Sequence, residues 1–519
     1  MALLDTSIDT SIGIVNAVVG TALDNLREIV LSIAAALITL IAYRLYLHPL
    51  AKFPGPFAAK ITSLWLYKLS YSGTEASTIE KLHAKYGPIV RVAPNELDIA
   101  SSEALNPIYI KGGGFLKPSY YANFDIDGFH TIFSAIDPAH RSVRSKAVLP
   151  LFATAAIRED KDVILSCVEK WVDRLQKDAV QSKENGSKVN LITGSRSLAL
   201  DVVTSYLFGK SYGGLDEDWT KEDGRLTASY FVDFFVSVGR FFYLPPVIFS
   251  WVTLMLENFD LNWGPDRYLK WKSNVAVEKY ATNIVKDAEA ARKAAGSTTQ
   301  PDESATPTGT YQTRLLAAGL SFDETVAQCK DLVFAGTDST GMNLSTICFH
   351  LVQNPKKHDR LRREVLEQPG ADAQTLPYLS AVVKEGLRIA MANPTRLPRV
   401  VPAGGLDVAG TSIPEGAVVG VGAYSVHFNP EVFPNPRKFE PERWLDATPE
   451  MVRDSVAFGV GGRQCIARNL ATAELFWAVQ AVVAKDVLRG ARTVGREIKI
   501  IEWFNSKVVG GKIELIWER

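Results

Sequence analysis

The stretch that organises the chain is residues 458–467, which read Phe-Gly-Val-Gly-Gly-Arg-Gln-Cys-Ile-Ala. Its glycines let the backbone turn tightly and approach a flat ligand closely. Cys465 follows this turn and precedes a helix-competent run, so we expect it at a helix N-terminus, where amide groups and the helix dipole favour a thiolate. A thiolate placed there can ligate haem iron, and Arg463 offers a guanidinium for a haem propionate. The alternative, for this stretch alone, is an ordinary glycine-rich loop that contains a cysteine.

The composition excludes several other classes of protein. The 519 residues include 57 basic and 57 acidic side chains, so the net charge of zero gives no sign of a nucleic-acid partner. A hydrophobic fraction of 47% is ordinary for a globular protein with a large core. The four cysteines are widely spaced and form no CxxC pair, which supports neither a disulfide framework nor a zinc site.

An apolar run near the N-terminus predicts a membrane anchor. Residues 29–43 are almost wholly apolar, and the run continues past Arg44 to Leu47, close to the ~20 residues that a bilayer span needs. Arg44 can extend its charge to the membrane surface. Basic residues follow the run and acidic residues precede it, which places the C-terminal part in the cytosol. We therefore expect a lumenal or interfacial segment at 1–28, an anchor at 29–47 and one domain at 48–519. A buried core helix is the alternative.

A second informative segment is a long predicted helix that starts after Ser321 and ends near Gln353. Ser321 and Glu324 form a capping box at its start. Residues 335–340, in its middle, read Ala-Gly-Thr-Asp-Ser-Thr. Small residues there allow a flat ligand to lie against the helix, and a buried acid is costly unless it is used or solvated. Where a Ser or Thr side chain disturbs the hydrogen bonds of the helix backbone, a groove for dioxygen and water can open. A kinked helix with satisfied polar groups is the alternative.

Three further patterns agree with these two. Glu385 and Arg388 share a helix face, and a proline-rich segment leads to Pro-Glu-Arg-Trp at 441–444. Asp137 and the proline after it start a helix that places His140 and Arg144 on one face.

Together these segments resemble the cytochrome P450 family. Four residues match its haem-thiolate signature: Phe458, Gly461, Arg463 and Cys465. Ala467 stands where the family usually has glycine. The resemblance covers roughly residues 53–519. It implies a mainly α fold of one catalytic domain with a small β region, whose first strands we place at 89–92 and 95–99, and it makes 53–56 a proline-rich hinge after the transmembrane anchor.

The resemblance also implies a role for each candidate residue. Cys465 is the axial ligand of haem b, and the other haem contacts are His140, Arg144, Ala335, Arg399, Phe458 and Arg463. Proton delivery falls to Asp338, Ser339 and Thr340, with Ser339 standing where the family usually has threonine. The buried ionic triad is Glu385, Arg388 and Arg443, whose role is structural.

The implied activity is that of a monooxygenase, which inserts one oxygen atom from O2 into a hydrophobic small molecule. No GxGxxG follows a predicted strand, so electrons come from NADPH–cytochrome P450 reductase. The motifs are similar to those of fungal microsomal members, which implies a single-pass protein of the endoplasmic reticulum membrane, facing the cytosol, in secondary-metabolite biosynthesis. Three rivals remain open: a haem-thiolate isomerase or dehydratase, an oxidative coupling enzyme, and a haem sensor without turnover.

Aromatic residues gather in two places that bear on substrate choice. Residues 111–133 lack periodicity and are rich in aromatic side chains, and the resemblance makes them a loop over the haem pocket. Residues 228–259 are also aromatic, and a membrane-dipping channel and plain core remain equal alternatives there. At the C-terminus, strands at 497–503 and 512–517 predict a hairpin around Gly510 and Gly511 whose tip contacts the pocket.

Overall fold

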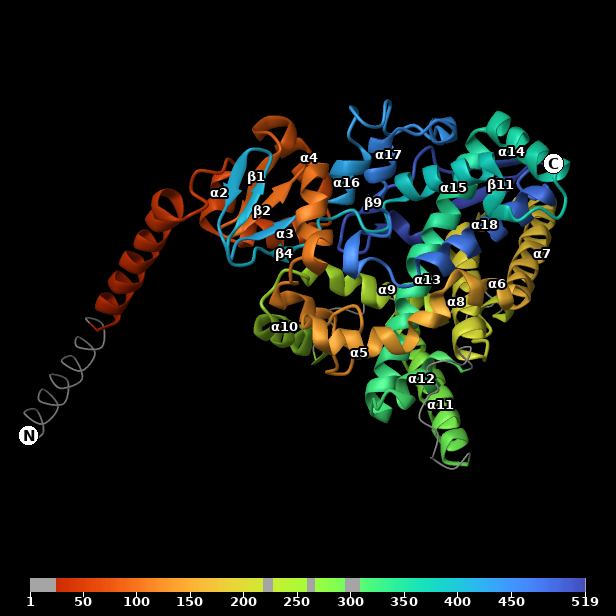
Figure 1. Ribbon diagram of the computed structural model, residues 1–519, viewed down its shortest axis with the longest axis horizontal. Coiled ribbons are helices and arrows are strands. Elements are labelled where there is room, and N and C mark those ends of the chain that lie inside the picture. The colour runs from red at the N-terminus through yellow and green to blue at the C-terminus, as the bar shows by residue number, and fades with distance from the viewer. Residues whose placement is uncertain (1–24, 218–226, 259–266, 295–308, 519) are drawn as a thin grey trace, which may run out of the picture.

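A computed structural model describes residues 25–217, 227–258, 267–294 and 309–518. Its centre is one long helix, α13 (Phe322–Gln353), which packs against α8 (Leu191–Phe208), α11 (Arg267–Ala294), α15 (Pro377–Ala390) and α18 (Arg468–Ala484) (Figure 1). The helix begins where the capping box predicts, because the Ser321 hydroxyl accepts a hydrogen bond from the Glu324 backbone N–H at 3.2 Å. Twenty-two of its residues are buried, which makes α13 the axis of the core.

The remaining helices surround this axis. Before α8 they are α2 (Phe57–Ile61), α3 (Leu64–Ser72), α4 (Glu75–Tyr86), α5 (Pro138–Val148), α6 (Thr154–Glu159) and α7 (Lys161–Asn185). After it come α9 (Thr227–Val238), α10 (Pro246–Asn258), α12 (Tyr311–Ala317), α14 (Pro355–Glu367), α16 (Ala423–His427) and α17 (Pro449–Arg453). Asp137 caps α5 as predicted, since its carboxylate accepts from the N–H groups of Ala139 and His140 at 3.0 and 3.1 Å.

The β region is small, as expected. A four-stranded sheet has the order β1 (Ile89–Ala93), β2 (Glu96–Ile99), β7 (Val418–Gly420), β4 (Arg399–Val400). The predicted pair β1 and β2 is antiparallel, whereas β7 joins β2 in parallel from more than 300 residues further along the chain. A two-stranded sheet pairs β5 (Leu406–Val408) with β6 (Thr411–Ile413).

The predicted C-terminal hairpin is wrong in its pairing. The strand β9 (Ile500–Ile501) pairs with β10 (Lys507–Val508), so the turn lies at residues 502–506. The last strand, β11 (Glu514–Trp517), instead joins β8 (Ala491–Thr493) and β3 (Val189–Asn190). Gly510 and Gly511, both with positive φ, connect the two sheets rather than turn a hairpin.

The N-terminal helix Asn25–Leu47 projects from the domain and is long and apolar enough to cross a membrane (Figure 1). The predicted segment 1–28 lies mostly outside the described residues. Arg44 donates to the Ile61 carbonyl at 2.6 Å, so its guanidinium contacts the domain. Gly55, in the proline-rich hinge, touches β1 so closely that a Cβ there would lie 2.3 Å from the Arg91 carbonyl oxygen.

Candidate active site

The cysteine loop is held by backbone contacts that only glycine permits. Gly461, in the short helix η12 (Gly461–Arg463), has a φ of +76°, and a Cβ there would lie 1.8 Å from the Tyr109 carbonyl oxygen. The Cys465 N–H donates to the Phe458 carbonyl at 2.9 Å and closes the loop. Cys465 lies in this loop, and α18 begins only at Arg468, with Ala467 as its N-cap residue.

The Cys465 side chain lies in an unusual environment. It is accessible to solvent, yet burial raises the pKa of its thiol above the ordinary value. The Ala467 N–H and the Arg468 charge lower this pKa, but by less than burial raises it. An accessible thiol enclosed by protein faces an internal space, and a cation bound there provides the charge that a thiolate needs.

The middle of α13 is accessible at one place within a mostly buried helix. Ala335 is exposed there, and Ser339 on the next turn is partly exposed. The Ser339 hydroxyl donates to the Ala335 carbonyl at 3.3 Å, at the expected position for a groove. Gly336 serves another purpose than predicted, since a Cβ there would lie 2.6 Å from a Val203 methyl group of α8. Ala335, which is exposed, is therefore the small residue against which a flat ligand can lie.

Asp338 is buried beside a cation that the sequence reasoning missed. Arg196 of α8 donates to its carboxylate at 2.5 Å and to Asp233 of α9 at 3.0 Å. Asp233 in turn accepts from Lys507 at 3.2 Å. Burial raises the pKa of Asp338 above its ordinary value, while Arg196 opposes this rise and Asp233 adds to it. Thr340, the second alcohol, is buried behind Asp338.

Four cationic side chains converge on the cysteine side of the aromatic loop. Arg399 and Arg463 were predicted, and the structure adds Lys117 and Arg141. Burial, with the charges of Arg141 and Arg399, lowers the pKa of Arg463 to about 10. Burial and the three arginines hold the pKa of Lys117 well below its ordinary range. Among the described residues none of the four forms an ion pair.

The contacts of these four cations hold the surrounding loops. Arg463 donates to the Ala135 and Ile136 carbonyls at 2.8 and 2.9 Å, just before α5. Lys117 donates to the Phe133 carbonyl and lies over the Tyr121 ring. Mutually repelling buried cations are costly without an anion. The cluster is therefore suited to the two carboxylates of a haem, and this fit supports a haem between α13 and the cysteine loop.

Two other predicted haem contacts, Arg144 and His140, have polar partners within the protein. Arg144 donates to the Glu324 carboxylate at 2.6 Å and to the His140 carbonyl at 2.8 Å, so its charge is already balanced. The His140 ring contacts the His130 carbonyl at 3.2 Å. Helix periodicity placed both residues on one face of α5, but Arg141, one position along, joins the cationic cluster.

The predicted ionic triad is assembled around Glu385, which is fully buried. Arg388 donates to both of its oxygens at 2.8 and 2.9 Å, and Arg443 donates at 3.1 Å. The Trp444 indole adds a bond at 2.8 Å. Although burial opposes the charged form, the Arg388 hydrogen bonds and charge hold the pKa of Glu385 below its ordinary value.

An aromatic cluster joins three segments of the chain. It includes Tyr120, Tyr121, Phe124, Phe242, Tyr243 and Phe504, with Phe133 packed against it. Phe504 lies in the β9–β10 turn, with its ring centroid 4.6 Å from that of Phe242 and 5.0 Å from that of Phe124. The aromatic loop, the α9–α10 join and the C-terminal turn thus meet in one apolar cluster, although the predicted tip at 510–511 takes no part.

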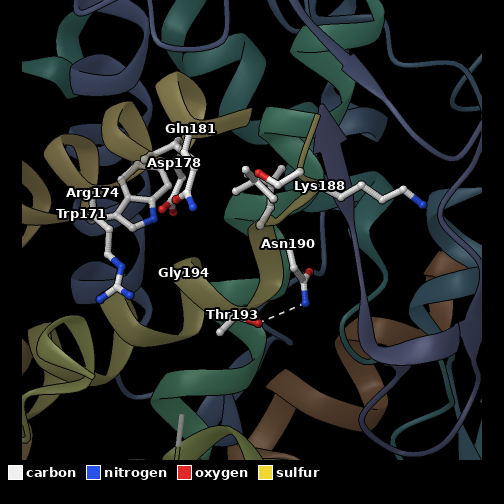
Figure 2. A pocket seen from close by; sticks show the side chains of 12 residues that line it. Trp171, Arg174, Asp178, Gln181, Lys188, Asn190, Thr193 and Gly194 are labelled. Atoms are coloured by element: carbon white, nitrogen blue, oxygen red, sulfur yellow. Dashed lines mark hydrogen bonds between the residues drawn. The ribbon is translucent and has the colours of Figure 1, made fainter. Parts of the chain in front are cut away.

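A separate hollow of about 300 Å³ lies between α7 and the start of α8 (Figure 2). Its lining includes Trp171, Arg174 and Asn190, and Asn190 donates to the Thr193 hydroxyl at 3.0 Å. None of the predicted site residues lines it, so this hollow is separate from the site that the sequence predicts.

Comparison with known proteins identifies the fold. The family model described as Cytochrome P450 matches residues 54–485. The chain belongs to the cytochrome P450 family. It is 40% identical over 496 residues to "Cytochrome P450 monooxygenase mfmF" of Annulohypoxylon moriforme, covering 92% of this chain and 97% of that relative.

More distant relatives extend the same picture. The chain is 31% identical over 466 residues to "Fusicoccadiene C-8 hydroxylase" of Alternaria brassicicola, with 85% of each chain covered. It is 29% identical over 489 residues to "Pisatin demethylase" of Fusarium vanettenii, with 86% of each chain covered. This cytochrome P450 is an oxygen-incorporating oxidoreductase of the monooxygenase class, and its family uses haem, O2 and a redox partner.

Proposed function

We propose that this cytochrome P450 binds haem b through Cys465 and oxidises a hydrophobic small molecule in secondary-metabolite biosynthesis. The observation that carries the proposal is the pairing, in one fold, of an accessible enclosed thiol with four cationic side chains, Lys117 and Arg399 buried and Arg141 and Arg463 partly buried, that form no ion pair among the described residues. The relatives named for a fusicoccadiene hydroxylation and a pisatin demethylation support a fungal small-molecule substrate.

Haem held by a thiolate supplies reductive activation of dioxygen. Lys117, Arg141, Arg399 and Arg463 would hold its propionates, and Phe458 and Ala335 would pack against the ring. His140 and Arg144 support this set from α5: Arg144 through Glu324, and His140 through the backbone of His130.

Proton delivery falls to polar side chains in the middle of α13. Asp338 holds a proton more readily than an exposed acid because burial raises its pKa. Ser339, one residue along, carries a hydroxyl that can pass the proton into the groove beside Ala335. Arg196 keeps the Asp338 carboxylate oriented, and Thr340 packs behind the pair.

The aromatic cluster sets the substrate class. Rings from three chain segments form an apolar cluster, and the Tyr121 hydroxyl in it accepts from Arg399 at 3.3 Å. A molecule bound there gains by burying apolar area and has few polar groups to satisfy.

We place the protein in the endoplasmic reticulum membrane as a single-pass protein facing the cytosol, with NADPH–cytochrome P450 reductase as its partner. The apolar helix Asn25–Leu47 supports an anchor. One face of α10 also exposes large apolar residues: Val247, Ile248, Trp251, Leu254 and Met255. This spacing puts all five on one side of the helix, which suits insertion into a lipid surface.

The experiment is a carbon-monoxide difference spectrum of the reduced, detergent-solubilised protein, beside Cys465→Ala and Cys348→Ala. We expect a thiolate-type Soret band in the parent and in Cys348→Ala, whose cysteine is buried in α13, but not in Cys465→Ala. Absence of the band from the parent contradicts the proposal. Incorporation of labelled dioxygen into product with reductase present then separates a monooxygenase from an isomerase, a dehydratase or a sensor.

A further inference from the structure

His427, the last residue of α16, lies between two parts of the active-site framework. Its side chain is buried, with only 1% of its surface exposed. One ring nitrogen, Nδ1, lies 3.1 Å from the Arg388 carbonyl oxygen of α15. The other, Nε2, lies 3.0 Å from the backbone nitrogen of Val456, two residues before Phe458. A single ring therefore bridges the ionic triad and the cysteine loop.

The hydrogen bonds fix which nitrogen carries the proton. The Val456 backbone N–H can only donate, so Nε2 must accept and Nδ1 must carry the hydrogen that is donated to the Arg388 carbonyl. Protonation of Nε2 places two donors face to face. Burial and the nearby Arg388 charge lower the pKa of His427 to about 3, which agrees with a neutral ring.

Arg388 and His427 also bind each other reciprocally. The Arg388 guanidinium donates to the His427 carbonyl at 2.8 Å, while the His427 ring donates to the Arg388 carbonyl. The same guanidinium donates to both oxygens of Glu385. The ring of His427 is thus as firmly positioned as the triad itself.

The connection continues from Val456 into the cysteine loop. The Val456 carbonyl accepts from the Gly459 N–H at 2.8 Å, and the Phe458 carbonyl accepts from the Cys465 N–H at 2.9 Å. An unbroken series of hydrogen bonds and short backbone segments therefore runs from Glu385 to Cys465. His427 is the only side chain in this series between Arg388 and the loop backbone.

We propose that His427 is a positioning residue that sets the conformation of the Cys465 loop by linking it to the Glu385–Arg388 pair. The inference rests on the proposed ligation of haem by Cys465. Its function is to hold the loop so that the thiolate keeps its place on the iron, and outer partners of this kind commonly change metal-site properties by about 10- to 100-fold.

Two variants separate the two hydrogen bonds of the ring. His427→Gln places an amide oxygen near the Nε2 position and keeps an acceptor for Val456. His427→Asn places an amide nitrogen near the Nδ1 position and keeps a donor for Arg388, but leaves the Val456 N–H without a partner. Both variants are neutral and polar, so they are matched controls for each other.

The readout is the carbon-monoxide difference spectrum of the reduced holoprotein, with the rate at which the thiolate-type band converts to the thiol type. We expect His427→Gln to retain the parent band and His427→Asn to convert about tenfold faster. Equal behaviour of the two variants, at whatever level, overturns the proposal. A parent protein without the thiolate-type band instead overturns the assignment of Cys465.

A second measurement needs no variant and covers the case in which His427→Asn does not fold. Hydrogen exchange of the full-length parent should show a Val456 amide that is as slow as the amides of α15. A fast-exchanging Val456 amide overturns the proposal whatever the variants do.

Discussion

The guanidinium of Arg196 lies 2.5 Å from the carboxylate of Asp338, and both side chains are buried. The two residues come from α8 and α13, 142 positions apart, and their helices form the most extensive contact in the fold. Gly341, one turn beyond Asp338, leaves the space that Arg196 occupies, since a Cβ there would lie 2.7 Å from its Cγ. The acid expected to deliver protons therefore lies in a fixed buried pair.

Arg196→Met tests this pair. Removing one partner leaves a buried carboxylate uncompensated, so we expect the free energy of unfolding to fall by about 3–5 kcal/mol. Arg489→Met is the control, because Arg489 pairs with Asp359 and Asp486 on the surface and should cost well under about 1 kcal/mol. Chemical denaturation measures both, and equal losses would contradict the prediction.

Ser339→Ala tests the hydroxyl beside the Ala335 carbonyl. We expect product formed per NADPH consumed to drop about tenfold or more, with peroxide released instead, because a proton donor in the groove is lost. Ser339→Thr should keep or improve the yield, since the added methyl group restricts the rotamer. Ser345→Ala, which removes a similar hydroxyl bonded to the Gly341 carbonyl on the same helix, should leave the yield unchanged.

Glu385→Gln removes the charge at the centre of the triad. Arg388 and Arg443 are then buried without a counter-ion, so we expect a loss of about 3–5 kcal/mol in the free energy of unfolding and low haem retention. Glu80→Gln breaks the exposed pair with Arg437 and should cost well under about 1 kcal/mol. A stable Glu385→Gln protein that retains haem would show that the triad is dispensable.

Glu474 predicts a dependence of stability on pH. Burial in α18 raises the pKa of its carboxyl to about 8, above the unfolded value of 4.5. The folded state therefore holds the proton more tightly, so this stability is fully present below pH 4.5 and is lost as the pH rises toward 8. In Glu474→Gln the free energy of unfolding should fall less steeply between pH 4.5 and pH 8, by up to about 1.4 kcal/mol per pH unit. Chemical denaturation at a series of pH values measures this slope. Glu497→Gln, on the surface, should leave the slope unchanged.

The exposed apolar face of α10 predicts a membrane contact beyond the anchor. We expect a chain that starts at residue 48 to sediment with lipid vesicles. The double variant of this chain, Trp251→Glu with Met255→Glu, should reduce the bound fraction several-fold. Val180→Glu, at an exposed position of α7, is the control. Equal binding of all three proteins would assign the apolar face to another contact.

Local patterns allowed much of this fold to be predicted. The N-cap at Ser321, the N-cap at Asp137 and the first two strands depend on neighbours in sequence, and all three are confirmed, although the Glu324 carboxylate binds Arg144 where a full capping box would use it at Ser321. The contacts of Glu385 with Arg388 and Arg443 follow from a motif whose spacing is distinctive.

Contacts between residues that are distant in sequence could not be predicted. Nothing near Arg196 indicates that it faces Asp338, and nothing near His427 indicates that it bridges Arg388 and Val456. Arg144 illustrates the same limit, because helix periodicity predicts the face of α5 on which it lies but not the acidic residue that binds it. That acid, Glu324, was assigned only to the cap of its own helix.

The joint between the N-terminal helix and the domain has a consequence for engineered forms of the protein. The buried guanidinium of Arg91 donates to the Arg44 carbonyl at 2.9 Å, and Arg44 itself holds the Ile61 carbonyl, so the helix leaves the domain at a fixed rotation. Adding or removing one residue of that helix before Arg44 rotates the part of the helix N-terminal to the change by about 100° relative to the domain. A foreign leader fused without regard to this register will turn a different face of its helix toward the enzyme, even with every residue after Arg44 intact.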